Sequence, residues 1–364
     1  MGRLLSRLCG KHCYQGDNAF LSIHPYLLLD VSSLAPMPVA KKAFALSSIV
    51  ALGAAAIVPA IAQTTLNGAG ATFPAPIYQK WFADLAGKGG PKVNYQGVGS
   101  GAGIRQFQAG TVDFGATDDP IDPAEAAKVS KGVVQFPSVG GSIAVAYNKA
   151  GCDLKLTQKQ VAQIFLGQIT DWKDLKCAPG PISLAYRSDG SGTTYAFTTA
   201  LSDWSADFKS KLSSGKTVQW PTGSGGKGNS GVAALIQQTD GSIGYINSDY
   251  VKAPIKAAAV QNKAGKFIKP TAASGAAGLA GIQLDATNAG SVTNPSNPAA
   301  YPLVTLTYIL AYKSGNAEKL DDLVKTFTYM LSKPAQGQAD DLQYVPLPAG
   351  IQAKSMAAIK QIGK

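Results

Sequence analysis

The spacing of apolar and polar positions predicts short strands that alternate with amphipathic helices from Thr64 onward. One helix, over residues 76–85, would place Ile77, Trp81, Phe82 and Leu85 on a single face. Apolar runs typical of strands occupy residues 93–96, 112–116, 133–137, 142–147, 181–186, 243–246 and 303–312. Helical patterns occupy residues 104–109, 124–130, 157–165, 195–201, 203–212, 232–238, 317–331 and 355–362.

This order of elements favours an α/β fold with mainly parallel sheets, whose ligands bind beyond the carboxyl ends of the strands. Gly140-Gly141 separates two predicted strands, and a second crossing point is expected near Pro302. Two lobes with a cleft between them would follow. Residues 262–300 are polar and weakly patterned, and we expect long loops with short helices there.

The N-terminal region has the pattern of an export signal. Lys41-Lys42 precedes an apolar run over residues 43–58, and Pro59-Ala60-Ile61-Ala62 supplies a small-residue cleavage site. A transmembrane anchor is the alternative, but the run is shorter than the roughly 20 apolar residues that a span needs. We expect a signal peptide over residues 37–62, cut after Ala62, and a secreted protein. Residues 1–36 are expected to be a non-functional extension from an upstream start.

Composition narrows the classes of function. The chain of 364 residues is 45% hydrophobic and 15% charged, as in globular proteins, and its net charge of +11 favours anionic partners. It has no run of five basic residues, so nucleic acid is not an expected partner. Both histidines precede the expected cut, which excludes His-based catalysis and His metal sites from the mature chain. We expect no metal and no cofactor.

Two cysteines, Cys152 and Cys177, remain after the expected cut. An even number of cysteines in an oxidising compartment favours a disulfide, and two buried free thiols are the alternative.

Candidate chemistry begins at residues 187–194, Arg-Ser-Asp-Gly-Ser-Gly-Thr-Thr, between a predicted strand and a predicted helix. Free N–H groups and the positive end of a helix dipole point out of such a junction, so an oxyanion would be stabilised there. The alternative is an ordinary turn in which Ser191 caps the helix. Asp189 either orients the Arg187 guanidinium or is a solvated turn residue.

Three similar junctions occur at residues 71–73, 99–101 and 117–118. Each alone is compatible with a cap or a turn. If all four converge, they form a cage rich in donors with one acceptor, the carboxylate of Asp118. Phosphate keeps at least one proton at neutral pH and sulfate keeps none, so Asp118 would accept a bond from phosphate and repel sulfate.

A glycine-rich segment, residues 223–231, suggests a nucleotide-binding loop. It lacks both the first glycine and the final Gly-Lys-Ser/Thr that a P-loop requires, because Pro221 and Gly228 occupy those positions. We expect a mobile or rim loop instead.

Residues 65–76, 94–101, 111–118 and 189–193 resemble the motifs of the periplasmic phosphate-binding proteins of phosphate ABC transporters, as do residues 226–229 and 342–348. The resemblance runs from about Thr65 to the C-terminus. It implies the two-lobed, venus-flytrap fold of periplasmic binding proteins, in which each lobe has a central, mainly parallel sheet flanked by helices. Lobe 1 would comprise residues 63–140 and 305–364, and lobe 2 residues 141–304.

The resemblance also implies a ligand set for inorganic phosphate: Thr72, Phe73 (through its backbone N–H), Ser100, Asp118, Arg187, Ser191, Gly192 (backbone) and Thr193. Asp189 falls on the family residue that pairs with the arginine. Two departures are Gly101-Ala102, where some relatives carry Ser and Gly, and the Cys152–Cys177 pair, which is not general in the family.

The expected function is therefore non-enzymatic: a monomer that binds phosphate in the periplasm and delivers it to a membrane permease. The alternative is a secreted phosphatase or phosphoester hydrolase built on the same cradle. That alternative needs a nucleophile with a base or metals, and the mature chain offers no histidine.

Overall fold

A computed structural model of the protein describes residues 64–364. The predicted N-terminal extension (residues 1–36), the signal peptide (residues 37–62) and the cut after Ala62 lie outside these residues.

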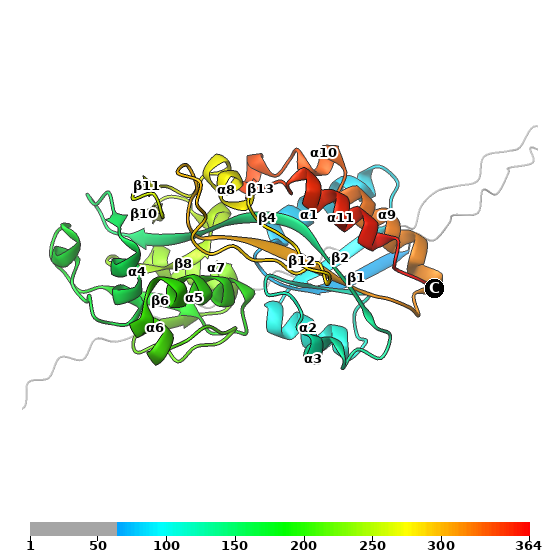
Figure 1. Ribbon diagram of the computed structural model, residues 1–364, viewed down its shortest axis with the longest axis horizontal. Helices are drawn as coiled ribbons and strands as arrows, with labels where there is room; N and C mark the ends of the chain where they lie inside the picture. The colour runs from blue at the N-terminus through cyan, green and yellow to red at the C-terminus, as the bar shows by residue number, and fades with distance from the viewer. Residues whose placement is uncertain (1–63) are drawn as a thin grey trace, which may run out of the picture. The chain divides into compact units, whose positions relative to one another are not determined.

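A ten-stranded sheet organises the described residues (Figure 1). Its main order is β2 (Lys92–Gly97), β1 (Thr65–Gly70), β3 (Phe114–Thr117), β12 (Val304–Tyr312), β4 (Val133–Asn148), β8 (Ser242–Asn247), β6 (Ser183–Arg187) and β7 (Ser224–Gly226). Two short strands, β13 (Tyr344–Val345) and β9 (Lys256–Ala257), also pair with β4. A small separate sheet contains β11 (Phe267–Ile268), β10 (Ala259–Gln261) and β5 (Lys155–Leu156).

The main sheet is parallel at its two ends and antiparallel in its centre. The first strand group, β1 to β3, pairs in parallel, and so does the second strand group, β6 to β8. The long strands β4 and β12 connect these groups with antiparallel ladders. The predicted α/β class is confirmed, and the ladders show that the parallel pairing lies on either side of an antiparallel centre.

The break predicted between residues 133–137 and 142–147 is wrong, because both belong to the single strand β4. Gly140 and Gly141, in the centre of this strand, instead leave room for side chains that pack closely against the backbone. A Cβ at Gly140 would lie 2.2 Å from Leu279 Cδ1, and one at Gly141 would lie 2.8 Å from Phe73 Cζ. Ladders to β12 and β13 hold this part of β4 in the sheet.

Helices pack on the sheet between these strands. They are α1 (Ala75–Gly87), α2 (Ser100–Gln108), α3 (Pro123–Ala126), α4 (Gln158–Phe165), α5 (Gly192–Trp204), α6 (Ala206–Lys211), α7 (Gly228–Gln238), α8 (Ala272–Leu279), α9 (Leu320–Met330), α10 (Lys333–Gln336) and α11 (Ala349–Ile359). In Figure 1, α1, α10 and α11 lie on one side of β4 near the first strand group, and α2 and α3 lie on the other. α7 packs against β6, β7 and β8.

Apolar periodicity predicted most of these helices, although it did not predict α10 and gave no bounds for α8. Several other boundaries differ from the prediction. α2 begins at Ser100 rather than residue 104, and α5 begins at Gly192 rather than residue 195. The last helix, predicted over residues 355–362, begins at Ala349 and ends at Ile359. The earlier starts matter because they place Ser100 and Gly192 within first turns, where backbone N–H groups are unpaired by the helix.

A continuous apolar core runs beneath both strand groups. Trp81 and Phe82 of α1 are buried as predicted, and the Trp81 indole donates to the Ala335 carbonyl at 2.8 Å. Cys152 and Cys177 form a disulfide with Cα atoms 5.5 Å apart. Within residues 64–364, no helix has both the length and the apolar character needed to cross a bilayer.

Candidate functional site

The start of α2 is held against the start of α5. Gly99 precedes α2 with φ +91°, and a Cβ there would lie 2.2 Å from Asp189 Oδ2, so this position requires glycine. Gly101 N donates to the Gly190 carbonyl at 2.9 Å. Two of the four predicted junctions are thus in direct contact.

Ser100 connects three of the predicted site segments. Its buried Oγ accepts from Asp118 N at 3.2 Å and from Gly192 N at 3.1 Å. A hydroxyl accepts two hydrogen bonds and donates one. Because both acceptor positions are filled, the Ser100 hydroxyl can bond to a further partner only by donating its proton.

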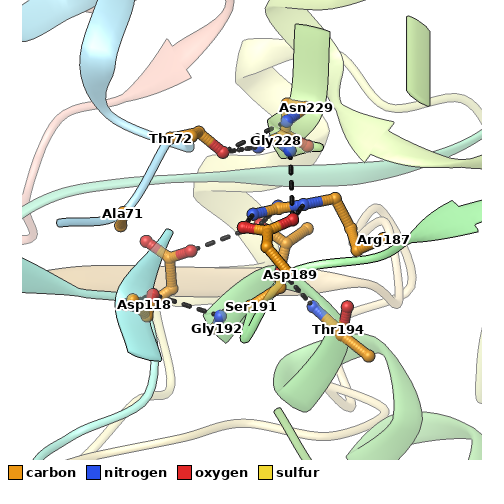
Figure 2. Close-up of polar contacts among 12 residues, drawn as sticks. Ala71, Thr72, Asp118, Arg187, Asp189, Ser191, Gly192, Thr194, Gly228 and Asn229 are labelled. Atoms are coloured by element: carbon orange, nitrogen blue, oxygen red, sulfur yellow. Dashed lines mark hydrogen bonds and ion pairs between the residues drawn. The ribbon is translucent and has the colours of Figure 1, made fainter. Parts of the chain in front are cut away.

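The hydroxyl of Thr72 is arranged in the same way. Its Oγ1 accepts from Asn229 N at 3.1 Å and from Asn229 Nδ2 at 3.2 Å, which again leaves the proton (Figure 2). Ser191 caps α5, and its Oγ accepts from Thr194 N at 3.0 Å. Three hydroxyls from three junctions are therefore set to donate.

Asp118 follows β3 and is only 3% exposed. Its Oδ2 accepts from Thr193 Oγ1 at 3.2 Å, whereas its Oδ1 has no hydrogen-bond partner among the described residues. Burial raises the pKa of this carboxyl to about 7. An unpaired buried carboxylate oxygen is costly, so Oδ1 favours a ligand that donates a hydrogen bond to it.

Arg187 lies at the end of β6, and its side chain is 1% exposed. Nε donates to Asp189 Oδ1 at 2.7 Å and Nη2 donates to Asp189 Oδ2 at 2.6 Å, a two-pronged ion pair (Figure 2). Nη1 lies 3.5 Å from Thr193 Oγ1. Burial opposes ionisation of Asp189, but its bonds to Arg187 outweigh burial and leave its pKa lowered. The pair fixes the guanidinium toward Thr193 and Asp118.

Phe73 is fully buried beside β4. Its carbonyl accepts from the Tyr344 hydroxyl at 2.6 Å and from Asn247 Nδ2 at 3.4 Å. These bonds come from β13 and β8 and fix the peptide between Phe73 and Pro74. All the segments expected from the sequence thus meet in one network of contacts.

The glycine-rich segment contributes to this network, so the prediction of a mobile or rim loop is wrong for its inner part. Ser224–Gly226 forms β7 and pairs with β6, and α7 begins at Gly228. Gly228 N donates to Asp189 Oδ1 at 3.0 Å, and Asn229 is fully buried against Thr72. Gly228 adopts φ +70°, which suits glycine at this close approach.

Comparisons with known proteins show to which family the chain belongs. The family model for the PBP superfamily domain matches residues 58–334. The phosphate-binding protein PstS of Xylella fastidiosa is 39% identical over 303 residues, which cover 79% of this chain and 82% of the relative. The PstS of Haemophilus influenzae is 40% identical over 310 residues, covering 80% and 92%. The chain belongs to the PstS family of phosphate-binding proteins.

Solved structures share the fold of this family. A high-affinity periplasmic phosphate-binding protein, PfluDING, bound with phosphate, has a TM-score of 0.68 at 22% identity, covering 81% of this chain and 93% of its own. An ABC-type phosphate transport receptor from Vibrio cholerae has a TM-score of 0.54 at 22% identity, covering 78% and 100%. These structures support the two-lobed α/β fold that the sequence resemblance implied.

Sequence reasoning assigned no role to three residues that support the network: Asn229, Asn247 and Tyr245. The Tyr245 hydroxyl accepts from Arg187 N at 3.2 Å, and it bonds to Thr194 Oγ1 at 2.8 Å. Asn229 Oδ1 accepts from Asn247 N at 3.1 Å. The sequence signal that could have indicated such a role is a polar residue in an otherwise apolar strand, such as Asn247 at the end of β8. Residues 64–364 contain no cluster of three His, Cys, Asp or Glu placed to hold a metal.

Proposed function

We propose that this protein binds inorganic phosphate in the periplasm and delivers it to the permease of a phosphate ABC importer. Its PstS relatives are named for phosphate binding, and its fold is that of phosphate-bound structures. The basic net charge of the chain assists the capture of an anion.

The arrangement of hydroxyl protons is the observation that carries this proposal. Thr72 and Ser100 each use both acceptor positions on N–H groups of the protein, so their protons are available for an oxyanion. The hydroxyl of Ser191 and the backbone N–H of Thr193, in the first turn of α5, add further donors, together with the dipole of that helix. The proposed ligand contacts are Thr72, Phe73 N, Ser100, Asp118, Arg187, Ser191, Gly192 (backbone) and Thr193, with Asp189 positioning Arg187.

Asp118 gives the site its preference among tetrahedral anions. Its unpaired Oδ1 accepts a hydrogen bond from a protonated phosphate oxygen, and ionisation of the carboxylate is favoured by that bond and by the nearby guanidinium of Arg187. Fully ionised sulfate has no proton to donate and meets the carboxylate as a like charge. The site therefore discriminates through repulsion as well as attraction.

Binding is coupled to closure of two lobes, residues 63–140 with 305–364 and residues 141–304. The contacts between Thr72 and Asn229, and between Ser100 and Gly192, join residues from opposite lobes. An anion that bridges both sets of donors stabilises the closed form by its preferential affinity for it. The permease then recognises the closed, loaded protein.

The protein acts without catalysis and without a cofactor, as a monomer. A phosphatase would need a nucleophile with a base or a metal, and no histidine follows residue 24. Asp118 is the carboxylate that faces the proposed ligand, and it is placed to accept a hydrogen bond from phosphate rather than to attack it.

Export follows from the signal peptide proposed over residues 37–62, with cleavage after Ala62, and residues 1–36 form a non-functional extension. Mass spectrometry of the protein recovered from the periplasm would show a new N-terminus at Gln63. An intact N-terminus on the membrane would contradict this processing.

Two assays on the same preparation test the function. Calorimetric titration with phosphate should show saturable binding at one site per chain. A simple aryl phosphate ester, incubated with and without divalent metal, should not be hydrolysed above the rate of an Arg187→Lys preparation. Absence of phosphate binding would overturn the proposal, and turnover that depends on Arg187 would favour the hydrolase.

A further inference from the structure

Lys216 lies outside the proposed ligand set, in the connection between α6 and β7, yet its backbone is attached to the helix that faces the ligand. Its carbonyl accepts from Ser191 N at 2.9 Å, directly before α5. One residue earlier, Gly215 N donates to Thr198 Oγ1 within α5 at 3.1 Å. The connection therefore moves with α5 and the second strand group.

The side chain of Lys216 extends to the other half of the protein. Nζ lies 2.8 Å from Asp119 Oδ2 and 3.1 Å from both carboxylate oxygens of Glu125. Asp119 directly follows the ligand-facing Asp118, and Glu125 is on α3 beside the first strand group. Among the ion pairs within residues 64–364, these are the ones that join the two strand groups.

The three charged side chains, Lys216, Asp119 and Glu125, are partly buried, which strengthens the interactions between them. The exposed fractions of the side chains are 24% for Lys216, 11% for Asp119 and 24% for Glu125, so solvent screens them only in part. Burial opposes protonation of Lys216, but its bonds to Asp119 and Glu125 outweigh burial and leave its pKa raised. Lys216 is therefore a fixed cation that two carboxylates share.

We propose that Lys216 is a positioning residue that holds the two lobes closed over phosphate, by tying the start of α5 to the segment that carries Asp118. This inference rests on the proposed function. The tie forms when the lobes meet and breaks when they part, so it slows the release of phosphate without touching it. Lys216 also neutralises Asp119, whose negative charge would otherwise lie beside the anion.

The test compares three variants with the wild-type protein by stopped-flow phosphate release and calorimetry. K216M removes the charge and keeps the length, K216R keeps the charge, and K211M removes an exposed lysine that pairs with Asp207 inside α6. We expect K216M to raise the Kd for phosphate by about 5- to 50-fold, because the loss of a half-buried ion pair should cost more than the loss of an exposed pair and less than the loss of a buried one. Most of this change should come from faster release of phosphate. K216R and K211M should stay within about twofold of the wild-type Kd, because K216R keeps the charge and K211M removes only an exposed pair.

Salt gives an independent readout, because the difference between K216M and the wild-type protein should shrink at molar salt. If K216M does not fold, K216Q takes its place. Wild-type release and Kd in K216M, or equal losses in K216M and K211M, would overturn the role of Lys216 while leaving phosphate binding intact. A wild-type protein that binds no phosphate would instead overturn the proposed function, and this inference with it.

Discussion

Replacing Asp118 by Asn should convert a site that selects phosphate into one that accepts phosphate and sulfate alike. The substitution keeps the size of the side chain and its bond to Thr193 Oγ1, whose partner is now an amide oxygen. It removes the negative charge that repels a fully ionised anion, and it places a donor where the unpaired Oδ1 lies.

The magnitude follows from the bonds involved. A hydrogen bond to a charged group contributes about 1.5–3 kcal/mol, so loss of the bond from phosphate to Asp118 weakens phosphate binding by about 10- to 150-fold. Sulfate gains in the same variant, because it no longer meets a like charge and can accept from the new amide. The ratio of phosphate affinity to sulfate affinity should therefore fall by a larger factor than either affinity changes alone.

The assay is calorimetric titration of stripped protein with phosphate and with sulfate, at neutral pH. Asp203→Asn is the matched control, since Asp203 is an exposed aspartate at the far end of α5. An unchanged affinity ratio in D118N, with wild-type fold and stability, would refute the assignment of Asp118 as the acceptor. A fall of the ratio in D203N as well would show that overall charge, rather than this carboxylate, sets selectivity.

Three further outcomes follow from the same geometry. R187K should weaken phosphate binding by about 100-fold or more, because an ammonium cannot make the two-pronged pair with Asp189; a calorimetric Kd within tenfold of wild type would contradict this. N229A leaves Asn247 N unpaired and removes one of the two hydrogen bonds to Thr72 Oγ1, since only the backbone N–H of residue 229 still donates to it. The free energy of unfolding of N229A should therefore fall by about 1–3 kcal/mol in urea titration, and an unchanged midpoint would speak against this. Because the folded pKa of Asp118, about 7, exceeds its ordinary 3.8, the unfolded state binds fewer protons between these values. The free energy of unfolding of the phosphate-free wild-type protein, relative to that of D118N, should therefore fall as the pH rises from 4 to 7 and stay constant above pH 7. An increase over that pH range would contradict a raised pKa for Asp118.

The junctions of the candidate site could be predicted from the sequence because each of them is built from local features. Each junction between a strand and a helix carries its own glycines, hydroxyls and cap, and such signals act over a few residues. Ser191 caps α5, as the alternative interpretation of this junction predicted. Its hydroxyl accepts from Thr194 N and still has its own proton to donate to a ligand. Here the local structure and the proposed function require the same residue type.

Parts of the site that depend on distant contacts were not predictable. Asn229 is fully buried because Thr72 lies against it, 157 residues away in the chain. Gly140 and Gly141 fit a strand break by composition, but their role comes from Leu279 and Phe73, which approach too closely for a side chain. Packing decided these positions, and the local pattern carried no signal for it.

The most direct measurement of the central claim is a crystal structure of the phosphate complex at a resolution that separates the ligand oxygens. One phosphate oxygen should lie within about 2.5–3.0 Å of Asp118 Oδ1, the distance of a hydroxyl bonded to a carboxylate. The other oxygens should contact Arg187, Ser100 and the start of α5. A phosphate bound elsewhere, or bound in the cleft with Asp118 Oδ1 turned away from it, would contradict the account.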